Sequence, residues 1–195
     1  AQLDVIGTDD LRALSTAAIR ALTSDALAAL DSAQIGSLTN AQVAALTSAQ
    51  LAALASEDIN SLGTAQFAAM TSAQVAAITA TQADAMATDD LAALAPNSIR
   101  ALTTDALAAL DSAQLPALTS AQVAALTSRQ IASLDQADLN ALTTAQYAAL
   151  TSAQVAALTT AQADVIATDD LAAISATSIK GLSTANIAAL DTAQF

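Results

Sequence analysis

The fold of this chain is decided by the stretch Leu46-Thr47-Ser48-Ala49-Gln50-Leu51-Ala52-Ala53. The same eight-residue unit, which we call the octad, recurs with substitutions from Ile6 to the end of the chain without insertion or deletion. Position 1 is Leu, Ile or Met, and position 6 is usually a large apolar residue. Position 2 is mostly Thr, Ser or Asp, position 5 is most often Gln, and positions 7 and 8 are mostly Ala. Such regularity indicates that one local structure is used throughout the chain.

Each octad carries the signature of a helix start. In the quoted octad, Thr47 is expected to be the N-cap, and Gln50 three residues later completes a capping box. Leu46 and Leu51 occupy the two positions of a hydrophobic staple. Pro96 falls at position 3 of its own octad, the first helical residue, where its missing N–H costs nothing. The pattern therefore predicts a helix of about one and a half turns in every octad.

A continuous helix and a β-solenoid are the two alternatives. Eight residues at about 100° each advance about 800°, or two turns plus about 80°, so the apolar stripe of a continuous helix would wind around it. In a strand, positions 1 and 6 would point to opposite sides, and the Ala content disfavours strands. We therefore predict an all-α solenoid of about two dozen very short capped helices, one per eight-residue repeat, stacked into an elongated rod.

The octad positions also predict which residues face inward. Positions 1 and 6 should form the core, including Phe67, Tyr147 and Phe195 at position 6, whereas positions 4 and 7 should face solvent. The small residues of position 8 indicate that a neighbouring repeat approaches closely there. Two octads per coil would give two facing layers of helices, and three or four would give a polygonal tube. We favour two, because facing layers of Leu and Val fill a gap of about 8–10 Å.

A longer period lies above the octad. Residues 21–100 align with residues 101–180 as an 80-residue block of ten octads. The chain is therefore predicted to be a single repeat array over residues 1–195, with partial copies of the block at 1–20 and 181–195. Both ends of the sequence fall inside an octad, so we expect a segment of a longer array.

Charge and composition exclude several function classes. The net charge is −13 with five basic residues, so nucleic acid and anionic membranes are poor partners. Apolar runs such as residues 26–30 are far shorter than the ~20 residues that span a bilayer, which argues against membrane insertion. Cys and His are absent, and no phosphate loop or catalytic motif is present. We therefore expect no enzyme, no catalytic, cofactor-binding or metal-binding residue, and no cofactor.

Two sets of polar residues are weighed as binding sites. Three carboxylates gathered together could bind Ca²⁺, although first-turn Asp residues also suit the helix dipole. The candidate clusters, one 80-residue block apart, are Asp4, Asp9 and Asp10; Asp84, Asp89 and Asp90; and Asp164, Asp169 and Asp170. The Thr and Ser residues of positions 2 and 3 form a regular ladder that could recognise ice or a polysaccharide. Position 2 is expected to cap helices instead, which uses its hydroxyl internally.

The octad from Leu118 to Ala125, with the pattern Leu-Thr-x-x-Gln-Val-Ala-Ala, resembles the octapeptide repeats of very large bacterial proteins of the cell surface, including adhesin-like ones. The resemblance covers the whole chain, implies an extracellular or cell-surface location, and transfers no site residues. Our first hypothesis is a structural repeat segment that acts as a stalk, spacer or filament building block. The alternative is a binding or adhesion module whose Thr/Ser face recognises a surface, a glycan or ice. The expected partners are neighbouring repeats of the same chain or of like chains, with a glycan or surface ligand in the alternative.

Overall fold

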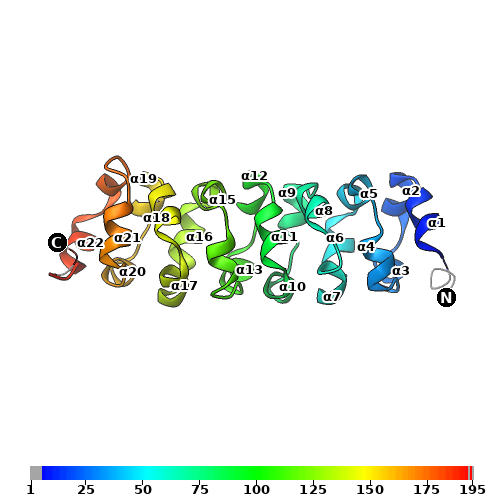
Figure 1. Ribbon diagram of the computed structural model, residues 1–195, viewed down its shortest axis with the longest axis horizontal. Helices are drawn as coiled ribbons and strands as arrows, with labels where there is room; N and C mark the ends of the chain where they lie inside the picture. Colours follow the sequence, from blue (N-terminus) through cyan, green and yellow to red (C-terminus); the bar gives the residue numbers. More distant parts are fainter. Residues whose placement is uncertain (1–5, 193, 195) are drawn as a thin grey trace. The chain divides into compact units, whose positions relative to one another are not determined.

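The computed structural model describes residues 6–192 and residue 194, and these residues are all-helical, with no strand (Figure 1). Contacts divide the chain into two compact units, Ala1–Ala109 and Leu110–Phe195. The helices of unit 1 are α1 (Thr8–Ala13), α2 (Thr16–Ala21), α3 (Ser24–Ala28), α4 (Ser32–Gly36), α5 (Asn40–Ala45), α6 (Ser48–Ala52), α7 (Ser56–Ile59), α8 (Thr64–Ala68), α9 (Ser72–Val75), α10 (Ala80–Ala85), α11 (Thr88–Ala93), α12 (Pro96–Ile99) and α13 (Thr104–Ala108). The helices of unit 2 are α14 (Gln114–Ala117), α15 (Ser120–Ala125), α16 (Ser128–Ser133), α17 (Gln136–Ala141), α18 (Thr144–Ala149), α19 (Ser152–Ala156), α20 (Thr160–Asp164), α21 (Thr168–Ala173), the 3-10 helix η1 (Ile179–Gly181) and α22 (Thr184–Ala189).

The predicted all-α repeat solenoid, with one short helix per octad, is confirmed for the described residues. Two expectations, the core role of Phe195 and the cluster containing Asp4, fall outside those residues. The unit boundary at Ala109 does not coincide with the boundary between the two 80-residue blocks. A single array over residues 1–195 therefore stays a prediction.

In most octads the side chain of position 2 caps a helix that begins at position 3. The Thr47 hydroxyl accepts from the Gln50 backbone N–H at 3.2 Å, and the Thr47 N–H donates to Gln50 Oε1 at 2.8 Å. This is the predicted capping box, and the same pair of bonds recurs in most octads. Pro96 is the first residue of α12, as expected. Among the described α-helices only α14 begins later than position 3, since Pro116 has no N–H to donate to the carbonyl of position 3.

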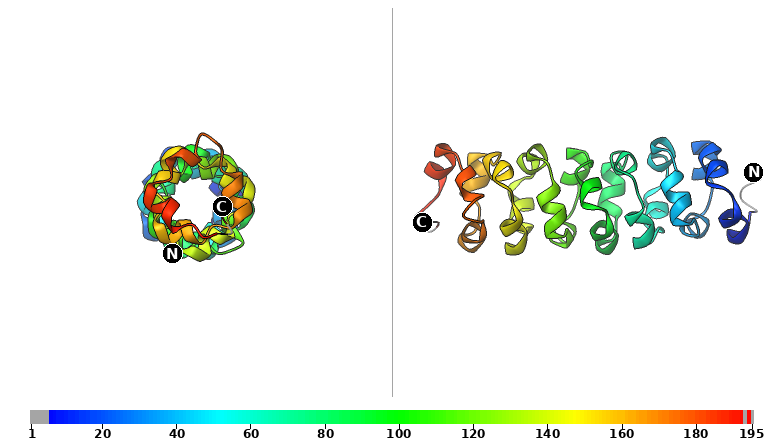
Figure 2. Two further views of the ribbon diagram at one scale, coloured as in Figure 1. Left: turned by 90° about the vertical axis from the view of Figure 1, so that its left-hand side faces the viewer. Right: turned by 90° about the horizontal axis from the view of Figure 1, so that it is seen from above.

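The number of octads in one coil differs from the expected two. In both units each helix packs against the helix three octads away, as in the pairs α2·α5, α8·α11 and α18·α21. The preference for two facing layers is therefore wrong, and the tube of three or four octads per coil is right. At the corners the backbone is extended over positions 1 and 2, as the ψ values of 141° at Leu46 and 156° at Thr47 illustrate. Every corner then turns the chain in the same sense, as the blue-to-green unit 1 shows in Figure 2.

The core of each unit consists of positions 1 and 6, as predicted. Phe67 is 0% exposed and Tyr147 is 1% exposed, which confirms both as core residues. The Tyr147 hydroxyl donates to the Leu139 carbonyl at 3.1 Å, and burial, followed by the charge of Asp170, raises its pKa. Position 4 is exposed in octad after octad, whereas position 8 is mostly half-buried. At position 8, a Cβ on Gly181 would collide with the backbone carbonyl of Ser152, so a neighbouring repeat does approach closely there.

Candidate functional site

The most regular polar feature of the structure is the buried Gln at position 5. Gln50 and Gln74 are each only 2% exposed, although both are long polar side chains. The Gln50 side-chain Nε2 donates to the carbonyls of Ile19 at 3.0 Å and Leu22 at 2.8 Å, which are 31 and 28 residues earlier. Gln74 repeats this arrangement on Val43 and Leu46, at 2.6 and 2.9 Å. We call this arrangement the Gln clamp: Oε1 closes the capping box of its own octad, and Nε2 binds two carbonyls at a corner of the preceding coil.

The Gln clamp supplies a donor to carbonyls at the end of a short helix; of these, the position 6 carbonyl also accepts from the N–H of position 1, as Ile19 does from Leu22 at 3.2 Å. The last carbonyls of a helix have no N–H to accept from within that helix, and the carbonyls of positions 6 and 1 lie at this end. Glu would close the capping box equally well, but a carboxylate has no hydrogen to donate. The chain holds a single Glu, Glu57, which lies at position 4 rather than position 5. The exclusion of Glu from position 5 was the sequence signal for the clamp, and reasoning from capping alone missed it.

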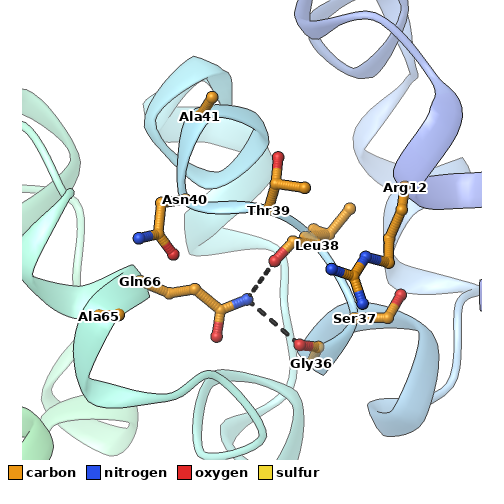
Figure 3. Close-up of a pocket in the computed structure, with 9 residues that line it drawn as sticks. All are labelled: Arg12, Gly36, Ser37, Leu38, Thr39, Asn40, Ala41, Ala65 and Gln66. Atoms are coloured by element: carbon orange, nitrogen blue, oxygen red, sulfur yellow. Dashed lines mark hydrogen bonds between the residues drawn. The ribbon is translucent and has the colours of Figure 1, made fainter.

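A surface depression of about 490 Å³ lies over one clamped corner of unit 1 (Figure 3). Gln66 donates to the carbonyl of Gly36 at 3.2 Å and to that of Leu38 within it. A Cβ on Gly36 would stand 2.7 Å from the Ser61 carbonyl, so only glycine permits this close approach. The residues that line the depression are Arg12, Gly36, Ser37, Leu38, Thr39, Asn40, Ala41, Ala65 and Gln66.

An equivalent depression of about 410 Å³ lies eight residues further along the chain, where Arg20 replaces Arg12 and Gln74 replaces Gln66. The depression is therefore a repeated property of the corner rather than a single pocket. Its Thr and Gln side chains are already engaged in capping boxes and clamps. Nothing in this lining combines a nucleophile with a base, because His and Cys are absent from the chain.

The hydroxyl ladder predicted from positions 2 and 3 is largely used inside the fold. Capping by position 2 is confirmed in most octads, as described for Thr47. At position 3, the Ser48 hydroxyl donates to the Ala73 carbonyl at 2.8 Å, and the Ser128 hydroxyl donates to the Ala153 carbonyl at 3.0 Å. These bonds join an octad to the octad three places further on. The ladder therefore contributes to stacking, and the hydroxyls that make these bonds are not free to recognise a regular surface.

Of the described Asp residues in the candidate Ca²⁺ clusters, Asp84 and Asp164 lie in the last turns of α10 and α20, and the others lie at helix starts. Asp89 and Asp90 are in the first turn of α11, and Asp169 and Asp170 are in the first turn of α21. Within the described residues, no three carboxylates come together in a way that could hold a metal ion. Asp170 accepts from the Thr144 hydroxyl at 2.8 Å, a contact between octads three places apart. Burial, followed by the charge of Asp89, raises the pKa of the Asp90 carboxyl.

Comparison with known proteins identifies the repeat. A family model described as ALTTAQ repeat matches residues 3–40, 51–88, 83–120, 107–136, 131–165 and 164–195, which is nearly the whole chain. No curated protein matches the chain. Within the described part of the chain, no helix combines the length and the apolar character needed to cross a membrane.

Proposed function

Because the chain belongs to the ALTTAQ repeat family, we propose that it is a structural segment of a large extracellular protein, where it acts as a stalk, spacer or filament building block. The observation that carries this proposal is the Gln clamp. Two hydrogen bonds from one side chain tie each clamped octad to a corner 28 and 31 residues earlier. An interaction that recurs in most coils lets an array lengthen by the addition of octads of the same pattern.

The proposal is of a structural role and not of catalysis. Among the described residues, every buried side-chain nitrogen and oxygen has a hydrogen-bond partner. The buried polar groups that an active site would draw on are thus committed to holding the coils together. The extracellular location rests on the resemblance of the octad to repeats of bacterial surface proteins, and the net charge of −13 suits an exposed, well-solvated segment.

Further octads of like chains are the partners that we propose. At the end of unit 2, Ile187 is 44% exposed, and Ile179, Leu182, Ile187 and Leu190 line an apolar depression of about 450 Å³. At most other octads of unit 2 the residues of positions 1 and 6 are buried, as Leu139 and Leu150 illustrate. A second copy of such a coil would continue the same interface. Association that rises with concentration and is lost in Ile187→Glu supports this partner, and a strictly monomeric chain contradicts it.

Small-angle scattering can test the structural role. The intact chain is compared with a longer chain in which residues 101–180 occur twice. A stalk requires the largest dimension to grow by the same increment for each added block. A dimension that grows only as a compact globule does would contradict the proposal. Removal of the repeat from intact cells by external protease tests the location separately.

The alternative, recognition of a glycan or of ice by a Thr/Ser face, has less support. It requires hydroxyls that point outward in a regular row, whereas many position 2 and position 3 hydroxyls are bonded inside the fold. Ice-recrystallisation inhibition by the intact chain would favour the alternative over a purely structural role.

A further inference from the structure

Two stretches of three octads in unit 1, residues 6–29 and 86–109, have no Gln at position 5, and the second of them follows a clamped coil. In residues 86–109, which we call the Gln-free coil, position 5 is Asp90, Ser98 and Ala106 instead of Gln. The preceding coil, residues 62–85, has Gln66, Gln74 and Gln82 at this position, and we call it the clamped coil. The same change recurs 80 residues later in unit 2, where Asp170, Ser178 and Asn186 occupy position 5.

The Gln-free coil has also lost helix caps. The N-cap residues of α11 and α12 are Ala87 and Ala95, and neither has a side chain that accepts a helix N–H. In unit 2 the N-cap of α21 is Ala167, and the next octad forms a 3-10 helix rather than an α-helix. Cap and clamp are both missing in the octads of Asp90, Ser98 and Asp170, whereas the Ala106 octad keeps its cap at Thr103. In unit 2, Asn186 still donates to the Leu158 carbonyl at 2.9 Å.

The polar contacts between the Gln-free coil and the clamped coil are correspondingly weak. Ser98 Oγ donates to the Met70 carbonyl at 3.4 Å, whereas Gln74 reaches its two carbonyls at 2.6 and 2.9 Å. The Ala106 side chain can donate nothing, and the Asp90 carboxylate can only accept. Apolar packing is not reduced, because Leu91, Ile99 and Leu107 are each 0% exposed. The two coils are therefore joined mainly by apolar packing, with few side-chain hydrogen bonds between them.

We propose that the seam between the clamped coil and the Gln-free coil is a built-in opening point. The seam lies inside unit 1, along the pairs α8·α11, α9·α12 and α10·α13. It separates transiently while coils joined by Gln clamps stay closed, because opening it leaves fewer hydrogen bonds unmade. An 80-residue period then gives the array one yielding seam per block. This inference does not depend on the proposed stalk role.

Thiol labelling tests the seam, because the chain has no Cys of its own. Leu91→Cys places a thiol in the Gln-free coil, and Leu51→Cys places one at the same octad position where Gln50 and Gln82 form clamps. Both leucines are 0% exposed, so labelling reports opening in each case. We expect the thiol at position 91 to react on the order of tenfold faster under native conditions. Equal rates, or faster labelling at position 51, would overturn the proposal.

Installing the clamp provides the converse test. In the Leu91→Cys chain, Ser98→Gln and Ala106→Gln together place donors 28 residues after the carbonyls of Met70 and Ile78, the clamp spacing. Labelling should slow by about threefold or more. The matched control is Asp105→Gln, which adds the same side chain at exposed position 4 and should leave the rate unchanged. If the control slows labelling as much as the double variant, the proposal fails. If circular dichroism shows that the double variant does not fold, the proposal is decided by the ratio of the labelling rates of the Leu91→Cys and Leu51→Cys chains.

Discussion

The clamped coil, residues 62–85, and the Gln-free coil, residues 86–109, have the same length and lie next to each other in unit 1. Both bury positions 1 and 6 almost completely, as Met70 at 3% and Leu94 at 1% illustrate. Only the clamped coil has Gln side chains that reach back to the previous coil. Apolar periodicity therefore determines where each octad faces, whereas the polar side chain of position 5 determines how firmly one coil holds the next.

The largest effect is expected from removing the donor of one clamp. Gln74→Glu keeps the capping box but loses both bonds from Nε2 and places a buried carboxylate beside the carbonyls of Val43 and Leu46. We expect a loss of about 2–4 kcal/mol in the free energy of unfolding, measured by urea titration. The control, Ala73→Glu, adds the same charge at exposed position 4 and should change it by less than about 0.5 kcal/mol. Equal losses would mean that the clamp contributes nothing.

The next effect concerns the close approach of coils at a clamped corner. A Cβ on Gly36 would stand 2.7 Å from the Ser61 carbonyl, so Gly36→Ala must push two coils apart. We expect a loss of about 1–3 kcal/mol in thermal or urea unfolding. Gly63→Ala is the control, because its nearest neighbour would be the Gln66 side chain at an ordinary 3.7 Å. A Gly36→Ala protein as stable as the unchanged chain would show that the corner can accommodate a methyl group.

Removing a helix cap in the clamped coil and adding one in the Gln-free coil should change the free energy of unfolding in opposite directions. Thr71→Ala removes the cap of α9 in the clamped coil and should cost about 1 kcal/mol. Ala87→Thr offers a cap to α11 in the Gln-free coil and should gain about 0.5–1 kcal/mol. The free energy of unfolding of each variant measures these changes. A gain at position 71 or a loss at position 87 would contradict the assignment of caps.

The smallest effect is the part of the pH dependence of stability that arises from Asp90 in the Gln-free coil. Burial first, and the charge of Asp89 second, raise the pKa of Asp90 above its ordinary 3.8. The folded chain thus binds this proton more tightly than the unfolded chain does. The resulting stability is fully present below pH 3.8 and is lost as pH rises through the raised pKa. Asp90→Asn should remove this part of the stability–pH curve and make the chain slightly more stable at pH 7.

The local structure could be predicted from sequence because its causes are local. Thr47 and Gln50 are three residues apart, and Pro96 needs only its own octad to define the start of α12. The core positions followed from the same pattern, as Phe67 and Tyr147 demonstrate.

The number of octads per coil could not be predicted in this way, because it depends on contacts between residues that are far apart in the sequence. Gln50 meets Ile19 and Leu22 only after the chain has turned through three to four corners. The capping box already accounted for a Gln at position 5, so the pattern of a single octad did not indicate that this Gln has a second role. The clue lay in comparison across octads, since Glu is absent from position 5 although it would cap equally well.

Hydrogen exchange of the side-chain amides, followed by NMR, tests the Gln clamp most directly. The Nε2 protons of Gln50 and Gln74, assigned through Gln→Glu variants, are compared with those of Gln136, an exposed side chain at position 3 with one long bond of 3.4 Å. Strong protection at Gln50 and Gln74, with rapid exchange at Gln136, is the predicted result. Equally rapid exchange at all three would mean that the coils are not joined by their glutamines.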